Sequence, residues 1–408
     1  MKIALGMSGG VDSSLSAHLL KEAGYEVTGV FLQCWRAPGC RADEDRQDAL
    51  KVALDLQIPF QVLDFVEEYK EKVVARFFED YKKGLTPNPD VWCNTAIKFG
   101  LFYDWAMDHG FDAVATGHYA RIGEFGGKKA LLKGIDVKKD QTYFLYRAGQ
   151  DQLDHIVFPI GGMTKKEVRQ AARERGLANA DKPDSQGICF IGDINVRDFL
   201  KDNLGEKPGN VLDAGGNVIG QHRGVWFYTI GQRHGFELLP KVRLQNNEWK
   251  HILPPLYVIS KDAKNNTITV GYGAKTLKSQ VEIRDIFWRR PDLEPELEPK
   301  PKNNGFGTNP NSQTSTSKFY SKSHFRDKLS QNYEERGAGA GRSASVNLLV
   351  RIRHGGQLYP AKFSWLDKEN HTGQLDFAEG IRGLAAGQAA VFYHSQNSEV
   401  CLGGAVLQ

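Results

Sequence analysis

The sequence predicts an α/β protein: a doubly wound parallel sheet, then a small, mostly helical middle region, then a C-terminal antiparallel β barrel. Three observations carry this prediction. Short β-rich runs alternate with longer helical patterns over the first 120 residues, the pattern is helical from about 150 to 204, and Gly-rich turns separate short alternating runs beyond residue 209. The change of pattern along 408 residues indicates several domains rather than one.

The N-terminal region has four apolar runs typical of buried strands. They cover residues 3–7, 27–32, 60–63 and 113–116. The first is followed by a helical pattern over 13–23, in which Leu15 and Leu19 share one face and Gly24 ends the helix. Strands that alternate with helices form a parallel sheet with helices on both faces. We expect the first domain to cover residues 1–149.

The middle region is expected to be a second domain over 150–208, with a capped helix start at Thr164 and Glu167. The third domain, 209–408, contains the runs expected to build the barrel, at 225–230, 256–260, 267–270, 346–352 and 389–393. Residues 291–345 are rich in Pro, Asn, Ser, Gly and charge. They cannot bury enough apolar surface to offset their ordering entropy, so we expect a disordered insertion there.

The composition narrows the class of protein. A hydrophobic content of 40% and a charged content of 25% exclude a disordered or fibrous chain, and the net charge of +4 permits a nucleic-acid partner without demanding one. Five cysteines do not suggest a disulfide framework. A glycine-rich pattern typical of phosphate binding begins within ten residues of Met1, so no leader sequence is expected. No apolar run is long enough to span a membrane. We expect a cytoplasmic protein and a monomer.

A glycine-rich turn follows the first predicted strand. It reads Ser8-Gly9-Gly10-Val11-Asp12-Ser13-Ser14 and opens the next helix, an arrangement that binds anions through oriented N–H groups and the helix dipole. It has neither the Gly-Lys-Ser/Thr ending of a P-loop nor a Gly-x-Gly-x-x-Gly pattern. The turn resembles the Ser-Gly-Gly-x-Asp-Ser signature of ATP-pyrophosphatases, which implies ATP and Mg²⁺ as cofactors and release of pyrophosphate.

Two further segments carry cysteines beside chemically useful neighbours. Residues 86–94 read Thr-Pro-Asn-Pro-Asp-Val-Trp-Cys-Asn, and 184–193 read Asp-Ser-Gln-Gly-Ile-Cys-Phe-Ile-Gly-Asp. Cys93 follows a double-Pro loop near the expected start of a helix, where a thiolate is favoured. Asp90 could move a proton at the same centre. Taken alone, either cysteine is more often a small buried hydrophobe than a nucleophile.

Together these segments resemble the tRNA-specific 2-thiouridylase family (the MnmA/TrmU enzymes). Further matching stretches are Ala115-Thr-Gly-His-Tyr-Ala120, Lys139-Asp140-Gln141-Thr142-Tyr143-Phe144-Leu145, Thr229-Ile-Gly-Gln-Arg233, 387–393 and 400–404. The resemblance implies that ATP adenylates the C2 oxygen of the wobble uridine in the lysine, glutamate and glutamine tRNAs. Cys189 would carry a persulfide from a cysteine desulfurase or sulfur-relay protein. Cys93 would be the catalytic thiolate and Asp90 the acid/base.

The resemblance also assigns binding residues. The domain over 1–149 would be the adenylation domain, and that over 150–208 a tRNA-binding domain with Cys189 near its end. ATP contacts fall on Gly6, Met7, Ser8, Gly9, Gly10, Val11, Asp12, Ser13, Leu32 and Gly117. Contacts with the tRNA anticodon stem-loop fall on Asn88, Pro89, Asp90, His118, Lys139, Asp140, Gln141, Arg353, His354 and Gln388. No resident metal site is expected, and an iron–sulfur cluster is a weaker reading than persulfide chemistry.

Other readings stay open at this stage. Cys34 stands where the family pattern usually has Asn, in Phe31-Leu32-Gln33-Cys34-Trp35, which affects only local contacts. Basic residues such as Lys165, Lys166 and Arg169 could follow a tRNA backbone or simply be solvated. A different adenylating ligase, which does not need the two cysteines, and a non-catalytic nucleotide-binding tRNA chaperone are the rival functions. Deleting 291–345 is expected to spare activity.

Overall fold

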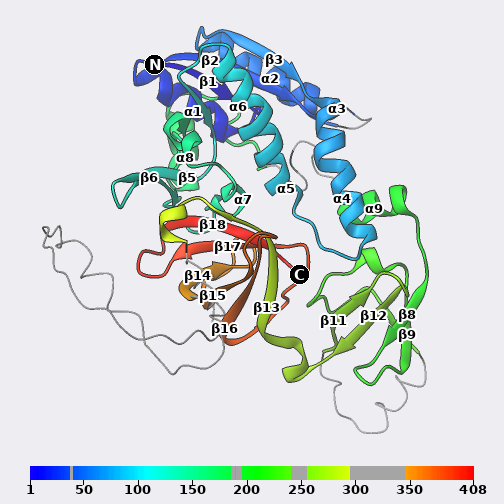
Figure 1. Ribbon diagram of the computed structural model, residues 1–408. Coiled ribbons are helices and arrows are strands. Elements are labelled where there is room, and N and C mark those ends of the chain that lie inside the picture. Colours follow the sequence, from blue (N-terminus) through cyan, green and yellow to red (C-terminus); the bar gives the residue numbers. More distant parts are fainter. Residues whose placement is uncertain (37–39, 185–188, 190–194, 240–254, 295–344) are drawn as a thin grey trace, which may run out of the picture.

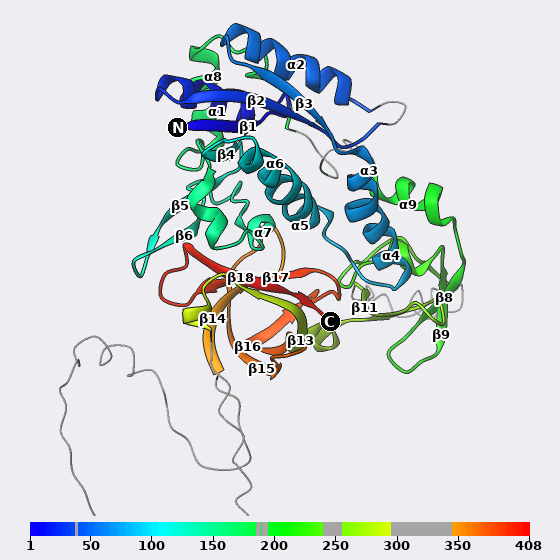
Figure 2. The same ribbon diagram turned by 45° about the horizontal axis from the view of Figure 1, so that its top comes forward.

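The computed structural model describes residues 1–36, 40–184, 189, 195–239, 255–294 and 345–408. Within these residues the strands form three sheets (Figure 1). The parallel sheet lies at the N-terminal end, the β barrel lies beneath it, and a smaller sheet stands to one side of the barrel (Figures 1 and 2). The expected insertion falls almost wholly outside the described residues. No helix in the described part of the chain is long and apolar enough to cross a membrane.

The N-terminal sheet is parallel throughout and has the strand order β3-β2-β1-β4-β7. Its strands are β1 (Lys2–Gly6), β2 (Glu26–Gln33), β3 (Phe60–Asp64), β4 (Ala113–Thr116) and β7 (Ile156–Val157). The four predicted strands are confirmed, with ends that shift by a residue or two. The short β7 was not predicted, because two residues inside a helical pattern give no strand signal.

Helices cover both faces of this sheet. On one face lie α1 (Val11–Glu22) and α2 (Ala42–Asp55), and on the other lies α6 (Phe102–Asp108). The region also contains α3 (Val66–Tyr69), α4 (Arg76–Lys82), α5 (Pro89–Trp92), α7 (Thr142–Leu145) and α8 (Lys165–Glu174). Two π-helices, η1 (Lys70–Ala75) and η2 (Cys93–Leu101), join α3 to α4 and α5 to α6. Ile3 and Leu5 pack into one core while Ala4 between them packs into the other, so the sheet is buried on both sides.

The described part of the middle region contains the α-helices α8 and α9 (Val196–Leu204), the 3₁₀ helix η3 (Asp151–His155) and short irregular segments. The predicted capped start is confirmed: the Thr164 hydroxyl accepts from the Glu167 backbone N–H, and Glu167 accepts from the Thr164 N–H. This reciprocal pairing satisfies donors that a helix N-terminus leaves unpaired.

The β-rich region after residue 209 forms two sheets. The first contains β8 (Gly209–Leu212), β9 (Val218–His222), β10 (Glu237–Leu238), β11 (Tyr257–Asp262) and β12 (Thr267–Gly271). The second contains β13 (Leu277–Trp288), β14 (Ser345–Arg351), β15 (Tyr359–Asp367), β16 (Thr372–Arg382), β17 (Ala389–His394) and β18 (Val400–Leu407). Pairing of β13 with β18 closes these six antiparallel strands into a barrel.

One predicted strand is wrong. Residues 225–230 begin with a 3₁₀ turn, η4 (Val225–Phe227), in which the Phe227 N–H donates to the Gly224 carbonyl. In a 3₁₀ turn, residues three apart point the same way, so Val225 and Tyr228 both enter the core of the smaller sheet. The apolar run resembles a strand only when the sequence is considered without this tertiary packing. Two further 3₁₀ turns are η5 (Gly273–Thr276) and η6 (Pro291–Leu293).

A hairpin from the N-terminal region joins the barrel. Strands β5 (Ala120–Phe125) and β6 (Lys128–Lys133) pair with each other, and β6 pairs with β18 of the barrel. Buried polar groups reinforce the junction: Arg351 makes an ion pair of 2.5 Å with Asp140, and both side chains are almost fully buried. The parallel-sheet region and the barrel are thus held against each other.

Candidate functional site

The phosphate loop, residues 7–14, runs from the end of β1 into the first turn of α1. Gly9 has φ +71°, and a Cβ there would stand 2.2 Å from the Asp45 carbonyl oxygen, so only glycine fits. Gly117, after β4, approaches so closely that a Cβ would lie 2.9 Å from the Ser13 nitrogen. The predicted residues of the loop and Gly117 therefore come together at the carboxyl edge of the sheet, where such folds bind ligands.

Side chains from the middle region complete the loop. Asn179 donates to the Gly9 carbonyl at 3.1 Å and to the Ser14 hydroxyl at 2.8 Å. The Lys182 ammonium contacts the Gly9 carbonyl and pairs with Asp45 and Asp48. Burial lowers the pKa of Lys182, but these two carboxylates outweigh it and raise the pKa. A cation is therefore held directly at the loop.

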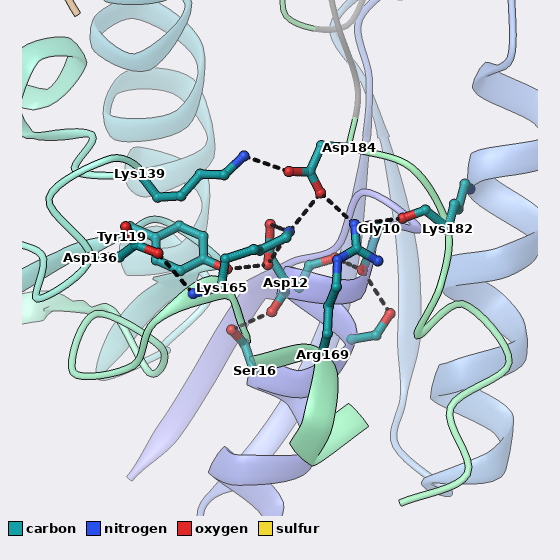
Figure 3. Close-up of polar contacts among 12 residues, drawn as sticks. Gly10, Asp12, Ser16, Tyr119, Asp136, Lys139, Lys165, Arg169, Lys182 and Asp184 are labelled. Carbon is teal, nitrogen blue, oxygen red and sulfur yellow. Dashed lines mark hydrogen bonds and ion pairs between the residues drawn. The ribbon is translucent and has the colours of Figure 1, made fainter. Parts of the chain in front are cut away.

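A charge cluster stands over the loop (Figure 3). It consists of Asp12, Lys139, Lys165, Arg169 and Asp184. Lys165 bridges the two carboxylates, at 2.8 Å from Asp12 and 2.7 Å from Asp184, and Asp184 also accepts from Lys139 and Arg169 (Figure 3). Burial raises the pKa of Asp184, but the hydrogen bonds from Lys139 and Lys165 lower it to about 2. Three cations thus surround two carboxylates above the loop.

The cysteine site, formed by Asp90, Cys93, Lys98 and Cys189, is a second centre. Pro89 opens the short helix α5, Asn88 caps it by accepting from the Val91 N–H, and Cys93 begins the π-helix η2. The Cys93 and Cys189 thiols are hydrogen-bonded and both are free of disulfides. The Cys189 N–H donates to the Asp90 carboxylate at 3.2 Å, and the Tyr69 hydroxyl donates to the Cys189 carbonyl. Asp90, Cys93 and Cys189 are therefore brought together.

The two thiols differ in their electrostatics. The hydrogen bond from Cys93, helped by nearby Lys98 and opposed by burial, lowers the pKa of Cys189 to about 7. Burial and the neighbouring Cys189 raise the pKa of Cys93 well above its usual range. Burial likewise raises the pKa of Asp90. Cys189 is therefore the more acidic thiol of the pair, and for Cys93 burial outweighs the helix-start effect expected from the sequence.

The residues expected to contact tRNA differ in burial and in their hydrogen-bond partners. His118 is buried beside Lys98, and Asp140 uses its oxygens for Thr142 and Arg351. Gln141 accepts from the Tyr119 N–H, Arg353 donates to the Gly383 carbonyl, and His354 stacks near Phe144. A direct tRNA contact by the Asp140 side chain would require its ion pair to open.

A small pocket lies between α5 and the barrel, and sequence reasoning missed most of its residues. It is lined in part by Arg76, Asn88, Trp92, Arg284 and Gly387. The Arg76 guanidinium lies 3.4 Å from the centre of the Trp92 ring. The barrel turn before Gln388 reaches this region, since the Thr86 N–H donates to the Ala386 carbonyl at 2.7 Å. Asn88 therefore borders a surface that combines aromatic and cationic groups.

Sequence reasoning also missed Lys98, Lys182 and Asp184 as site residues, and it considered Lys165 and Arg169 only for a tRNA backbone. Nothing in the local pattern distinguishes these side chains from solvated ones. Among the described residues no group of three or more His, Cys, Asp or Glu side chains could hold a metal ion.

Sequence similarity to known proteins extends over nearly the whole chain. Three family models match: the tRNA methyl transferase HUP domain over residues 1–193, the tRNA methyl transferase PRC-barrel domain over 197–272 and the aminomethyltransferase beta-barrel domain over 330–407. The tRNA-specific 2-thiouridylase MnmA of Listeria monocytogenes is 38% identical over all of this chain and 94% of its own length. That of Lysinibacillus sphaericus is 46% identical over 67% of this chain and 71% of its own length.

Among solved structures, the U34-tRNA thiolase NcsA from Methanococcus maripaludis matches with 18% identity and a TM-score of 0.33, covering 50% of this chain and 67% of its own. That likeness is too low to transfer any property. The full-length similarity to the MnmA proteins is decisive on its own. The chain belongs to the tRNA-specific 2-thiouridylase family of sulfurtransferases.

Proposed function

We propose that this protein uses ATP to replace the C2 oxygen of the wobble uridine of lysine, glutamate and glutamine tRNAs by sulfur. The observation that carries the proposal is the pair of hydrogen-bonded thiols, Cys93 and Cys189, beside the buried carboxyl of Asp90. The phosphate loop in the same region supports the use of ATP, since its N–H groups and the helix dipole suit a polyphosphate. Membership in the family supports tRNA as the substrate.

In the first step the C2 oxygen of the uridine attacks the α-phosphorus of ATP, so that an O–P bond forms and pyrophosphate leaves. Lys165, Arg169 and Lys182 would neutralise the charge of the leaving pyrophosphate. These cations are now paired with carboxylates, which phosphate oxygens would replace. We keep ATP contacts at Leu32 and Gly117 as part of the proposal.

Mg²⁺ binds through one or two carboxylates together with substrate phosphates, and Asp12 at the loop offers such a carboxylate. The partly exposed Asp12 side chain fits this role once Lys165 turns to the phosphates. The ion would supply charge neutralisation at the leaving group.

In the second step sulfur comes from a persulfide on Cys189, and two routes fit the thiol pair. Cys93 can attack the Cys189 sulfur while Asp90 accepts the Cys93 proton, and release hydrosulfide, which then attacks C2 and expels AMP. Alternatively the outer persulfide sulfur attacks C2 and expels AMP, and Cys93 then attacks the Cys189 sulfur to free the thiouridine. Both routes leave a Cys93–Cys189 disulfide, which a dithiol reductant reduces. Asp90 would donate or accept the proton that is transferred when Cys93 attacks and the sulfur leaves.

We also propose that the anticodon loop binds at the pocket beside Asn88, Pro89 and Trp92. An unpaired base needs little energy to leave an anticodon loop, and aromatic and guanidinium groups suit single-stranded RNA. Lys139, Gln141, His354 and Gln388 remain proposed tRNA contacts. The sulfur donor would be a cysteine desulfurase or a relay protein, and the working state a monomer.

The test is reconstitution with tRNA, ATP, Mg²⁺, a cysteine desulfurase, cysteine and a dithiol, followed by mass spectrometry of nucleosides and assay of pyrophosphate. Wild type should form 2-thiouridine, AMP and pyrophosphate. Cys93→Ser and Cys189→Ser should form no 2-thiouridine, because a hydroxyl can neither carry nor cleave a persulfide sulfur. Cys40→Ser, which changes a thiol outside the cysteine site, is the matched control. Persistent 2-thiouridine in either site variant would contradict the proposal.

The same assay separates the rivals. An adenylating ligase of another kind would release pyrophosphate on its own acceptor and would not need either cysteine. A tRNA chaperone without catalysis would release no pyrophosphate.

A further inference from the structure

Lys98 lies on the π-helix that begins at Cys93. Hydrogen bonds in a π-helix run between residues five apart, so Cys93 and Lys98 are one turn apart on neighbouring positions of the same face. In an ordinary α-helix residues five apart point in clearly different directions. The local π geometry therefore explains why a lysine reaches the cysteine site.

The Lys98 ammonium is held between two groups. It lies 3.4 Å from Nε2 of His118 and is hydrogen-bonded to the Cys189 thiol. A lysine ammonium has only donors, so Nε2 of His118 must accept, and the imidazole proton is then on Nδ1. That nitrogen lies 2.7 Å from the Thr116 hydroxyl oxygen. Thr116 and His118, from β4 and the turn after it, thereby fix the direction of Lys98.

The imidazole is suited to this role because it stays neutral. His118 is 7% exposed, and burial together with the charge of Lys98 lowers its pKa well below the usual range. A neutral ring keeps the Nε2 lone pair that Lys98 needs. Lys98 itself stays charged: burial lowers its pKa, but the neighbouring Cys189, Cys93 and Asp90 outweigh burial and raise the pKa.

Several titratable groups face Cys189 from different elements. They are Asp90 on α5, Cys93 and Lys98 on η2, Tyr69 on α3 and Cys34 after β2. Of these five described residues only Lys98 is a cation, while Asp90 and an ionised Cys93 would oppose negative charge on the Cys189 sulfur. The anion needed for sulfur uptake thus depends on one ammonium and one donated hydrogen bond.

We propose that Lys98 is a catalytic residue of the cysteine site: its ammonium, oriented by His118, stabilises the thiolate of Cys189 and the persulfide anion that follows it. His118 is a positioning residue that acts through Lys98. This inference deepens the proposed function and rests on it for the persulfide. No bond forms or breaks at Lys98, which supplies charge alone.

The test measures alkylation of Cys189 by iodoacetamide against pH, by mass spectrometry of its peptide, in the full-length protein without ATP or tRNA. In wild type the rate should reach half its maximum near pH 7. In Lys98→Met the midpoint should rise by about one unit, so that alkylation at pH 6.5 slows about tenfold. Lys98→Arg should restore the wild-type profile within about threefold, because the positive charge returns.

A second pair of variants keeps the test decisive if Lys98→Met does not fold. His118→Leu removes the acceptor and should slow alkylation of Cys189 at pH 6.5 about threefold, while His118→Gln keeps an acceptor and should slow it less. Alkylation of Cys40 in the same digests should not change in any variant. A Cys189 profile that stays at wild type in folded Lys98→Met, or in both His118 variants, overturns the proposal.

Failure of the proposed function has a separate signature. If Cys189→Ser still makes 2-thiouridine, Cys189 does not carry the sulfur, whatever the alkylation profiles show. If Cys189→Ser is inactive but Lys98→Met leaves the alkylation profile unchanged, the proposed function stands and the role of Lys98 falls.

Discussion

The phosphate loop and the cysteine site stabilise charged groups in opposite ways. Around the loop, Lys165 and Lys182 are each paired with two carboxylates, so the charges are numerous and already satisfied. In the cysteine site, burial dominates: it raises the pKa of Asp90 and Cys93 and leaves one ammonium beside the sulfurs. The first arrangement suits exchange of one anion for another, and the second suits control of a proton.

If this contrast is correct, substitutions at the two centres should separate the two steps of the proposed reaction. Changes at the loop should reduce pyrophosphate release and therefore everything after it. Changes at the cysteine site should reduce 2-thiouridine while the pyrophosphate released in the first turnover is unchanged.

The largest effect is expected for Gly9→Val. Gly9 has φ +71° and no room for a Cβ beside Asp45, so valine would displace the loop. Pyrophosphate release and 2-thiouridine should both fall to background, since a single oriented donor to a developing anion is worth about 10²–10³ in rate. Gly110→Val is the control, because Gly110 has a similar φ of +74° but open space around it. That variant has the same backbone strain without a steric clash at the loop. Pyrophosphate release by Gly9→Val at more than a few per cent of wild type would contradict this account of the loop.

Asp90→Asn should lower 2-thiouridine formation about 10²–10⁴-fold, because the amide keeps the contact with the Cys189 N–H but cannot transfer a proton. The pyrophosphate released in the first turnover should stay at the wild-type level, measured in the same reaction with enzyme and tRNA at equal concentrations. The exposed Asp104→Asn on α6 is the matched control. Equal loss of both products would show that Asp90 serves the adenylation step, and the contrast between the two centres would fail.

Lys165→Met should lower pyrophosphate release about 10–100-fold, as expected for a charged hydrogen bond worth about 1.5–3 kcal/mol. The control is Arg173→Met on the same helix, whose pairing with Asp181 is exposed. That substitution should leave the rate unchanged. If Lys165→Met and Arg173→Met lower pyrophosphate release equally, the loss comes from a general change in α8 and not from the contact between Lys165 and the loop.

The smallest predicted effect is a pH dependence of sulfur uptake. The pKa of Cys189 is lowered to about 7, so its thiolate is the main form above pH 7 and is lost as the pH falls. The rate at which Cys189 gains one sulfur atom from a small persulfide donor should fall about tenfold for each unit below pH 7. Peptide mass spectrometry from pH 5.5 to 9 measures it. A midpoint at about 8.5, the usual value of an unperturbed thiol, would remove the distinction between Cys189 and Cys93.

Much of the fold follows from local pattern. The parallel strands were predictable because they are short β-rich runs that alternate with longer helical patterns, and β4 was predicted over the same residues, 113–116, that the structure shows. The barrel strands β14 and β17 were found within a residue or so for the same reason. The separate sheet of β8–β12 and the 3₁₀ turn at Val225 were not found, because they depend on which core the apolar residues enter. The domain boundaries stay predictions.

The site divides in the same way. Cys93, Cys189, Asp90 and the loop were predicted because they lie in recognisable motifs. Lys98 was not, because its place depends on a π-helix that a sequence pattern with a period of 3.6 does not reveal. Asp184 and Lys182 reach the loop from a region more than 160 residues away, and such contacts are fixed by tertiary packing rather than by local sequence.

The pairing of β6 with β18 makes each part of the molecule depend on the other. A fragment ending at residue 193 would contain the phosphate loop and the β5–β6 hairpin, yet it would leave the β18-facing edge of β6 unpaired and Asp140 without Arg351. An unpaired strand edge promotes aggregation, and an uncompensated buried carboxylate costs about 3–5 kcal/mol. If the C-terminal barrel were exchanged for another domain during evolution, the new domain would therefore have to supply a strand that pairs with β6 and a cation that pairs with Asp140.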